Sequence, residues 1–231
     1  VLVATVRALK MHGGAAKSSL AVPDTAAVRK GLVNLEKHIE NIKKYNVPLV
    51  VAINIFAQDT EEELEAIRSH CAGCGANVAL SDVFAKGGEG GRALAEEVVA
   101  LAESGCADFR PLYGSEMKLS DKIKKIAQEI YGAADVAFAK EAESALKQFE
   151  ELGYGHLPVC MAKTQYSLSD DPTLLGRPEG FTMTVKNARI SAGAGFVVVL
   201  TGDIMTMPGL PKVPAAERID VTDEGVISGL F

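Results

Sequence analysis

The 231-residue chain is 48% hydrophobic and 23% charged, which supplies enough apolar material for a sizeable core. Its net charge of −6 argues against nucleic acid as the main partner, because neutralising phosphates requires a basic surface. The sequence shows neither the roughly 20-residue apolar run that spans a bilayer nor a signal peptide. We therefore expect no membrane partner. Four cysteines do not form a disulfide framework, which favours a reducing compartment.

The first six residues form an apolar run that predicts a buried strand at 1–6. The run lacks an initiator Met, and natural termini usually lie at the surface, so we expect the chain to be a fragment of a longer protein. A loop rich in Gly and Ser follows at 12–20. Asp24 is then a candidate N-cap for a helix. Apolar residues recur along that helix at steps of three and four: Val28, Leu32, Leu35, Ile39 and Ile42.

The segment 47–53 gives the strongest strand signal, because it is apolar on both faces, as a central parallel strand requires. A loop at 54–59 leads to a helix that starts near Thr60. The remaining predicted elements follow in chain order: strand 77–81, loop 82–91, helix 92–103, an irregular stretch 105–118, helices 120–131 and 139–152, strands 157–162, 181–186 and 196–201, and a C-terminal stretch with little regular structure. This alternation predicts an α/β fold with parallel-sheet layers and flanking helices. We expect domain boundaries near residues 45 and 130.

Ligands of parallel α/β sheets bind beyond the carboxyl ends of the strands, so the loops after the predicted strands are the places to search. The segment after the first strand offers candidates for an anion site: Arg7, Lys10, His12, Gly13 and Gly14. Such glycines let backbone N–H groups approach an anion, although a surface turn explains the segment equally well. The stretch 12–19 fails to match the phosphate-binding pattern G-x-x-x-x-G-K-[ST], because Ala16 stands where Gly is required.

Two phenylalanines fall at the tips of successive loops. Phe56 follows the strand 47–53, and Phe84 follows the strand 77–81. If the two rings faced each other across a cleft, they could hold a flat heteroaromatic ring between them, and each stacked pair would contribute about 0.5–1.5 kcal/mol beyond burial. The more common fate of Phe is to pack into a core, and the residues alone favour that interpretation.

Several other motifs carry weaker signals. The segment 88–93 matches G-x-G-x-x-[GA] of dinucleotide sites, but its loop is too long and Glu89 would repel a pyrophosphate. Cys71 and Cys74 form a C-x-x-C at a helix end, where the dipole disfavours a redox thiolate; without a second such pair, no zinc site is expected. The last pocket candidates follow strands or lie in a P-x-x-P segment: Lys163, Thr164, Gln165, Pro208 and Gly209.

The segment 4–14, Ala-Thr-Val-Arg-Ala-Leu-Lys-Met-His-Gly-Gly, resembles the second signature segment of formate–tetrahydrofolate ligases. This match is far longer, and so more specific, than the motifs above. The resemblance covers essentially the whole chain and continues through five other segments: 34–39, 51–54, 85–91, 163–167 and 204–211.

Such enzymes join formate to tetrahydrofolate with Mg-ATP, through formyl phosphate. They are typically cytoplasmic homotetramers activated by a monovalent cation, with small-molecule substrates and no covalently bound cofactor. The resemblance implies that residues 1–45 end a nucleotide-binding domain, that 46–130 bind folate and that 131–231 form a C-terminal α/β domain. It implies a folate held between Phe56 and Phe84, with Leu80 nearby, and it puts the anion-site candidates on the nucleotide side.

Two positions of the expected pterin site depart from the family pattern. Family members often have Trp where Phe84 stands and Pro where Ala57 stands, so a smaller ring and a freer loop predict looser binding. The 231 residues contain no G-x-x-x-x-G-K-[ST], so we expect no catalytic residue in them and no activity from the chain alone. Two alternatives stay open, namely a non-catalytic assembly module that docks through 208–214 and a dinucleotide-binding oxidoreductase.

Overall fold

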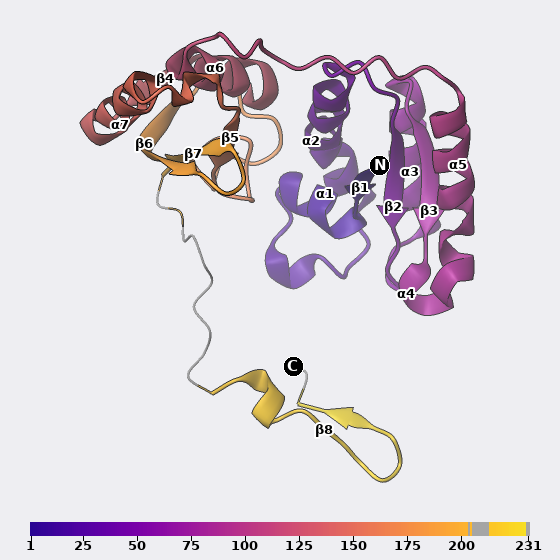
Figure 1. Ribbon diagram of the computed structural model, residues 1–231. Helices are drawn as coiled ribbons and strands as arrows, with labels where there is room; N and C mark the ends of the chain where they lie inside the picture. The colour runs from indigo at the N-terminus through magenta and orange to yellow at the C-terminus, as the bar shows by residue number, and fades with distance from the viewer. Residues whose placement is uncertain (203, 205–212, 230–231) are drawn as a thin grey trace.

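The computed structural model describes residues 1–202, 204 and 213–229, which contain two α/β units (Figure 1). The first sheet has the order β1-β2-β3 and is parallel throughout. Its strands are β1 (Leu2–Ala4), β2 (Val50–Asn54) and β3 (Asn77–Ser81). The strands predicted at 47–53 and 77–81 are therefore confirmed. β2 is the central strand, and its apolar residues are buried between two layers of helices.

Helices flank this sheet, and side chains cap two of them. Asp24 Oδ1 accepts a hydrogen bond from Ala27 N at 2.8 Å, as expected of an N-cap. Thr60 and Glu63 form a capping box, in which each side chain bonds the other residue's backbone N–H. The helical elements of this unit are α1 (Val6–His12), η1 (Lys17–Ser19), α2 (Thr25–Lys43), α3 (Glu61–Gly73), α4 (Val83–Lys86), η2 (Gly87–Gly91) and α5 (Arg92–Glu103).

The beginning of the chain departs from expectation. The strand predicted at 1–6 ends at Ala4, and a seven-residue helix, α1, follows directly. Thr5 has extended backbone, and its Oγ1 accepts a hydrogen bond from Ala8 N at 3.1 Å, which starts the helix. The Gly- and Ser-rich loop therefore begins only after α1.

The second unit holds a four-stranded sheet of order β4-β6-β7-β5. Its strands are β4 (Asp135–Phe138), β5 (Val159–Ala162), β6 (Thr182–Ser191) and β7 (Phe196–Thr201). The sheet is mixed: β4 pairs in parallel with β6 and β5 with β7, whereas β6 and β7 are antiparallel and joined by a tight turn, in which Gly195 N donates to Ser191 O. The helical elements beside this sheet are α6 (Leu119–Ile126), η3 (Ala127–Tyr131), α7 (Lys140–Glu151) and η4 (Tyr154–His156).

Strand β4 was not predicted, whereas the helices predicted at 120–131 and 139–152 are present, with α6 running on into η3. Towards the C-terminus the described residues hold η5 (Ala215–Glu217) and a small antiparallel pair, β8 (Asp220–Val221) with β9 (Ile227–Ser228). Each large sheet has its own apolar core. The first core includes Val6 and Leu35 together with Ile53 and Ile67, from both sides of the boundary expected near residue 45. Both expected boundaries stay predictions.

A polar stripe on α2 joins the two units. Asn34 and Asn41 each donate to a backbone carbonyl of the second unit at 2.8 Å, and Lys37 Nζ donates to a third at 3.0 Å. Arg177 adds a bidentate ion pair with Glu40, at 2.8 and 2.9 Å. α2 is therefore packed on two sides, with apolar residues toward the first sheet and polar ones toward the second unit.

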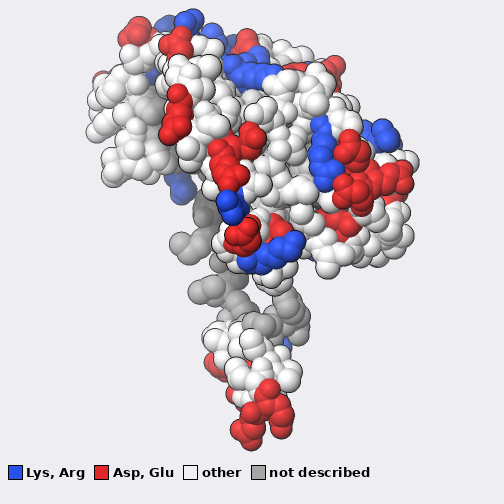
Figure 2. Space-filling view, turned by 90° about the vertical axis from the view of Figure 1, so that its right-hand side faces the viewer, with Lys and Arg blue, Asp and Glu red and all other residues white. Residues whose placement is uncertain are grey.

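Charged side chains of both signs are interspersed on the face shown in Figure 2, rather than gathered into a basic stripe. Among the described residues, every helix is too short or too polar to cross a membrane.

Two helical glycines provide a test of the close packing between α1 and α2. A Cβ on Gly31 would lie 1.9 Å from Leu9 O, whereas one on Gly73 would meet nothing within 4 Å. We expect Gly31→Ala to lower the free energy of unfolding by at least about 1–3 kcal/mol, because backbone must move. Gly73→Ala, the matched control, should be neutral or stabilising by up to about 1 kcal/mol. Urea unfolding followed by circular dichroism measures both, and equal stabilities would contradict the packing argument.

Candidate functional site

The loops that follow β2 and β3 are bonded to each other beyond the ends of the strands. Ile55 N donates to Ser81 O at 3.0 Å, which continues the pairing of the two strands into their loops. Phe56 comes directly after Ile55, and Phe84 lies in α4, beyond the end of β3 (Figure 1). The structure therefore carries the two predicted aromatic residues on adjacent loops at the carboxyl edge of the sheet, where ligands of parallel sheets bind.

The backbone and the ring of Phe56 are both held in place. Asp59 Oδ2 accepts a hydrogen bond from Phe56 N at 2.9 Å, and Asp59 N donates back to Phe56 O at 2.9 Å. The Arg7 guanidinium carbon lies 4.4 Å from the centroid of the Phe56 ring, a cation–π distance. With the Gln58 amide turned so that its oxygen faces Arg7, Arg7 Nε donates to it at 2.7 Å. One face of the Phe56 ring is thus covered by a fixed cation.

Phe84 differs from Phe56, because its side chain is wholly exposed. The loop that carries it is nevertheless closed, since Asp82 N donates to Gly90 O at 2.9 Å and Lys86 Nζ pairs with Asp82 at 3.0 Å. A Cβ on Gly90 would lie 2.2 Å from Asp82 O, so this close approach requires glycine. The close packing therefore explains why glycine stands at position 90 of the segment 88–93, and no bound dinucleotide is needed to explain it. Leu80 is half-buried and packs against the first core.

Lys10, a candidate for the nucleotide side, is wholly buried. Its Nζ lies 2.7 Å from Glu63 Oε1, and neither side chain reaches solvent. Lys10 Nζ also donates to the carbonyls of Leu20 and Val22, at 3.3 and 2.9 Å. Both partners are therefore satisfied inside the protein, and the ammonium group is bound to the protein's own oxygens.

The Glu63 carboxylate accepts further hydrogen bonds from Asp24 N at 2.7 Å and from the backbone and hydroxyl of Thr60 at 3.0 Å. Burial alone would raise its pKa, but the hydrogen bonds from Lys10, Asp24 and Thr60 outweigh burial and lower the pKa from 4.5 to about 2. Glu63 is thus an anion throughout the neutral range, and it contributes to stability only while it is ionised.

The other candidates of the first segment lie apart from Phe56. His12 lines a 390 Å³ cavity with Thr5, Asn34 and His38 beside the outer edge of β1, and its Nδ1 accepts a hydrogen bond from Gly176 N at 3.2 Å. Burial, and then the charge of His38, lowers the pKa of His12, which favours the neutral imidazole.

Gly13 serves the packing of helices, because a Cβ on it would lie 2.0 Å from Ala27 O. Gly14 has φ +95°, a conformation that favours glycine. Of the five nucleotide-side candidates, the structure brings Arg7 together with Phe56, while Lys10 and Gly13 are built into the interior.

The candidates at the end of β5 line a separate cavity in the second unit. Lys163, Thr164 and Gln165 border an 850 Å³ hollow that also reaches Tyr166 and Thr201. Lys163 Nζ donates to Thr164 O at 2.7 Å and to Ser167 O. Burial lowers its pKa to about 8, an effect that the charge of Asp170 opposes. Pro208 and Gly209, and with them most of the segment 208–214, lie outside the described residues.

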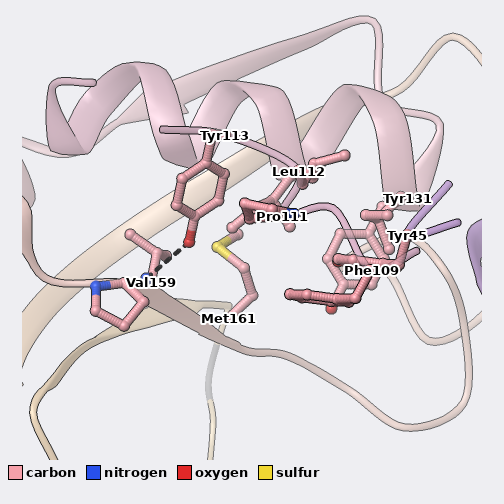
Figure 3. Close-up of a pocket in the computed structure, with 11 residues that line it drawn as sticks. Tyr45, Phe109, Pro111, Leu112, Tyr113, Tyr131, Val159 and Met161 are labelled. Carbon is pink, nitrogen blue, oxygen red and sulfur yellow. Dashed lines mark hydrogen bonds between the residues drawn. The ribbon is translucent and has the colours of Figure 1, made fainter. Parts of the chain in front are cut away.

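Sequence reasoning missed an aromatic pocket of 320 Å³ where the segment 104–118 crosses α6, η3 and β5 (Figure 3). The rings of Tyr45 and Phe109 are stacked there with an interplanar angle of 1°. Tyr113 OH accepts a hydrogen bond from Val159 N at 3.0 Å, while Met161 forms part of the wall. The aromatic residues of the stretch predicted to be irregular were the available signal.

Comparison with known proteins adds one finding. A family model described as formate–tetrahydrofolate ligase matches residues 1–231. The match therefore covers both α/β units and includes the Phe56 and Phe84 loops.

Removing one partner of the buried Lys10–Glu63 pair should destabilise the chain strongly, because the other charge is left unpaired. We expect Glu63→Gln or Lys10→Met to lower the free energy of unfolding by about 3–5 kcal/mol at pH 7. Since the pKa of Glu63 falls from 4.5 to about 2 on folding, its contribution is complete above pH 4.5 and lost as pH falls toward 2. Wild type should lose stability over that window more steeply than Glu63→Gln does.

Urea unfolding at a series of pH values measures both effects. Glu62→Gln is the matched control, because Glu62 is the exposed neighbour of Glu63 on the same helix. A Glu63→Gln chain with the stability and pH dependence of the control would show that the ion pair contributes nothing.

Proposed function

This chain belongs to the formate–tetrahydrofolate ligase family, and from that premise we propose that its loops after β2 and β3 hold the pterin ring of tetrahydrofolate. Enzymes of this family use ATP and join formate to tetrahydrofolate. The proposal concerns which part of that reaction these residues perform.

The observation that carries the proposal is that two phenylalanine rings, one held in place and one exposed, lie on loops joined by a hydrogen bond. Phe56 is fixed from one side by Arg7, and Phe84 stands wholly exposed on a closed loop. An exposed ring on a loop closed by hydrogen bonds has apolar surface to bury against a flat ligand. Leu80, in the strand that precedes the Phe84 loop, is half-buried and offers further apolar surface for the ligand. Phe56, Phe84 and Leu80 together form the proposed pterin platform.

Arg7 supports a second step of the proposal. Its guanidinium lies against the Phe56 ring, and a guanidinium is suited to a phosphate group because it presents several N–H donors. Arg7 at the border of the platform would place a fixed positive charge beside formyl phosphate as the folate amine attacks it. Reactions of this kind depend mainly on positioning and charge neutralisation, and both would be supplied by groups that are already in place.

The same family membership extends the proposal to further features. Mg-ATP would be the phosphoryl donor, with a monovalent cation as activator, in a cytoplasmic homotetramer. The cavity lined by Lys163, Thr164 and Gln165 is proposed as a further part of the substrate pocket.

Replacing either ring of the platform should weaken the binding of tetrahydrofolate to this chain. Because a lost ring contact costs about 0.5–1.5 kcal/mol beyond burial, we expect Phe56→Ala and Phe84→Ala each to raise Kd by at least about 2- to 13-fold. Phe84→Trp, which offers a larger ring, should lower Kd. Isothermal titration calorimetry with tetrahydrofolate measures these changes.

Phe109→Ala is the matched control, because Phe109 is another exposed ring and lies in the aromatic pocket of Figure 3. Phe84→Ala removes no packing and should leave thermal stability unchanged. Unchanged affinity in both platform variants, with a loss in Phe109→Ala, would move the folate to the aromatic pocket and end the platform proposal.

The 231 residues should form no product by themselves, because they contain no G-x-x-x-x-G-K-[ST] segment to hold ATP phosphates. Incubating the pure chain with Mg-ATP, formate and tetrahydrofolate, and following 10-formyltetrahydrofolate by absorbance after acidification, measures this directly. ATP-dependent product would show that other residues of the chain bind the nucleotide.

A further inference from the structure

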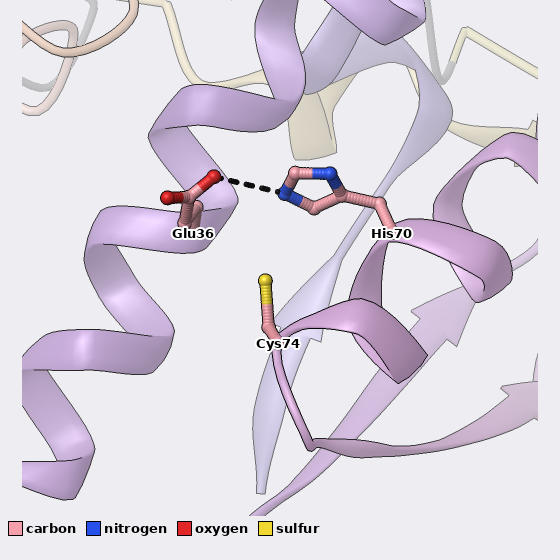
Figure 4. A group of neighbouring side chains, drawn as sticks. All are labelled: Glu36, His70 and Cys74. Carbon is pink, nitrogen blue, oxygen red and sulfur yellow. Dashed lines mark ion pairs between the residues drawn. The ribbon is translucent and has the colours of Figure 1, made fainter.

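Three side chains that commonly bind metals meet between α2 and α3 (Figure 4). Glu36 comes from the middle of α2, His70 from the last turn of α3, and Cys74 is the C-cap of α3. One carboxylate oxygen, one imidazole nitrogen and one sulfur all lie within 4.8 Å of one another. Since α3 starts beyond the carboxyl end of β2 and ends before β3, this cluster lies at the opposite edge of the sheet from the proposed pterin platform.

The distances suit a tetrahedral ion. His70 Nε2 lies 3.2 Å from Glu36 Oε2. Two ligands bound tetrahedrally at the usual zinc–nitrogen and zinc–oxygen lengths stand about 3.4 Å apart, and sulfur stands about 3.6 Å from either. The nitrogen and the oxygen are thus already near their places, and Cys74 Sγ needs to approach by at most about 1.2 Å.

His70 Nε2 supplies an independent observation. The atom is shielded from solvent, although the His70 side chain as a whole is 27% exposed; it lies at ion-pair distance from Glu36 Oε2 but completes no hydrogen bond among the described residues. A shielded ring nitrogen that completes no hydrogen bond is costly, and a metal ion in the position between the three side chains would satisfy it. In Figure 4 the imidazole points toward Glu36, and the sulfur of Cys74 lies below both.

The surrounding charges leave this position open to a cation. Arg177 Nη1 approaches the other carboxylate oxygen of Glu36, Oε1, at 3.6 Å, so Oε2 stays available. Lys43 Nζ is turned to the backbone, where it donates to Cys74 O. An ordinary cysteine is a protonated thiol at neutral pH, so a metal bound by Cys74 would displace its proton.

We propose that Glu36, His70 and Cys74 bind a divalent transition-metal ion, best fitted by Zn²⁺, as a clamp between α2 and α3. A thiolate and an imidazole favour zinc over magnesium or calcium, which prefer oxygen ligands. Three protein ligands leave one tetrahedral position for water. Binding forms a sulfur–metal bond and releases the Cys74 proton to the buffer.

The proposal departs from the expectation that the C-x-x-C carries no metal. Cys71 is not part of it, since its thiol is wholly buried in the first core and burial raises its pKa to about 11. The ligand that completes the set comes from another helix.

The proposal is tested by titrating the full chain, freed of metal, with Zn²⁺ in a calorimeter. We expect one site in the wild type, and a heat that varies with the ionisation enthalpy of the buffer because a thiol proton is released. Cys74→Ser and His70→Gln should each weaken binding at least tenfold, since even partners outside the ligand shell affect affinity by about 10–100-fold. Cys160→Ser and His156→Gln, exposed residues of the second unit, are matched controls and should bind as wild type does.

A second measurement keeps the test valid if a variant folds poorly. Co²⁺ added to the wild type should give a thiolate-to-cobalt charge-transfer band that Zn²⁺ abolishes, and circular dichroism reports the folding of each variant. Absence of Zn²⁺ binding by the wild type would overturn the proposal. Binding that survives Cys74→Ser, or that is lost in Cys160→Ser instead, would overturn it equally.

Discussion

The buried ion pair between Lys10 and Glu63 holds together α1, the loop before α2 and the first turn of α3, next to the Phe56 side of the proposed pterin platform. Lys10 belongs to α1, and it also binds the carbonyls of Leu20 and Val22 in the loop before α2. Glu63 belongs to the first turn of α3 and accepts from Asp24 N at the start of α2. Three helix ends and one loop therefore meet at a single pair of charges.

This pair joins the two segments that carry Arg7 and Phe56. Arg7 precedes Lys10 by one helical turn on α1, and Phe56 belongs to the loop that Thr60 ends. The cation–π contact between Arg7 and Phe56 thus joins two segments that Lys10 and Glu63 already hold together. A well-packed apolar pair could match the stability of such an ion pair, but it would not satisfy the carbonyls and N–H groups that converge there.

The sequence predicted the elements with a clear period or a long apolar run. The central strand at 47–53 and the helix with Val28 and Leu32 on one face were both found. α1 was missed because seven residues are too few to show a helical period and Val6 continues an apolar run. β4 was missed because it has only four residues. The antiparallel pairing of β6 with β7 depends on a glycine-containing turn that carried no strong signal of its own.

Side-chain roles were harder to predict than elements. Phe56 and Phe84 were placed on the right pair of loops, because strand order along a parallel sheet brings consecutive loops together; their binding role stays a prediction. Lys10 looked like an anion ligand because a sequence does not show that Glu63, far along the chain, occupies its ammonium group. No metal site was expected at Cys74, because the sequence does not show that Glu36, on a different helix, lies beside it.

Helix α2 connects the two α/β units through ion pairs as well as through packing. Its carboxylate Glu36 faces His70 through one oxygen and Arg177 of the second unit through the other, and Arg177 is also clamped by Glu40. A metal ion bound by Glu36, His70 and Cys74 would be coordinated by the same Glu36 carboxylate that pairs with Arg177. Occupancy of the proposed metal site and the contact between the two units are therefore linked through one side chain, because a carboxylate that binds a cation has less charge to offer a guanidinium.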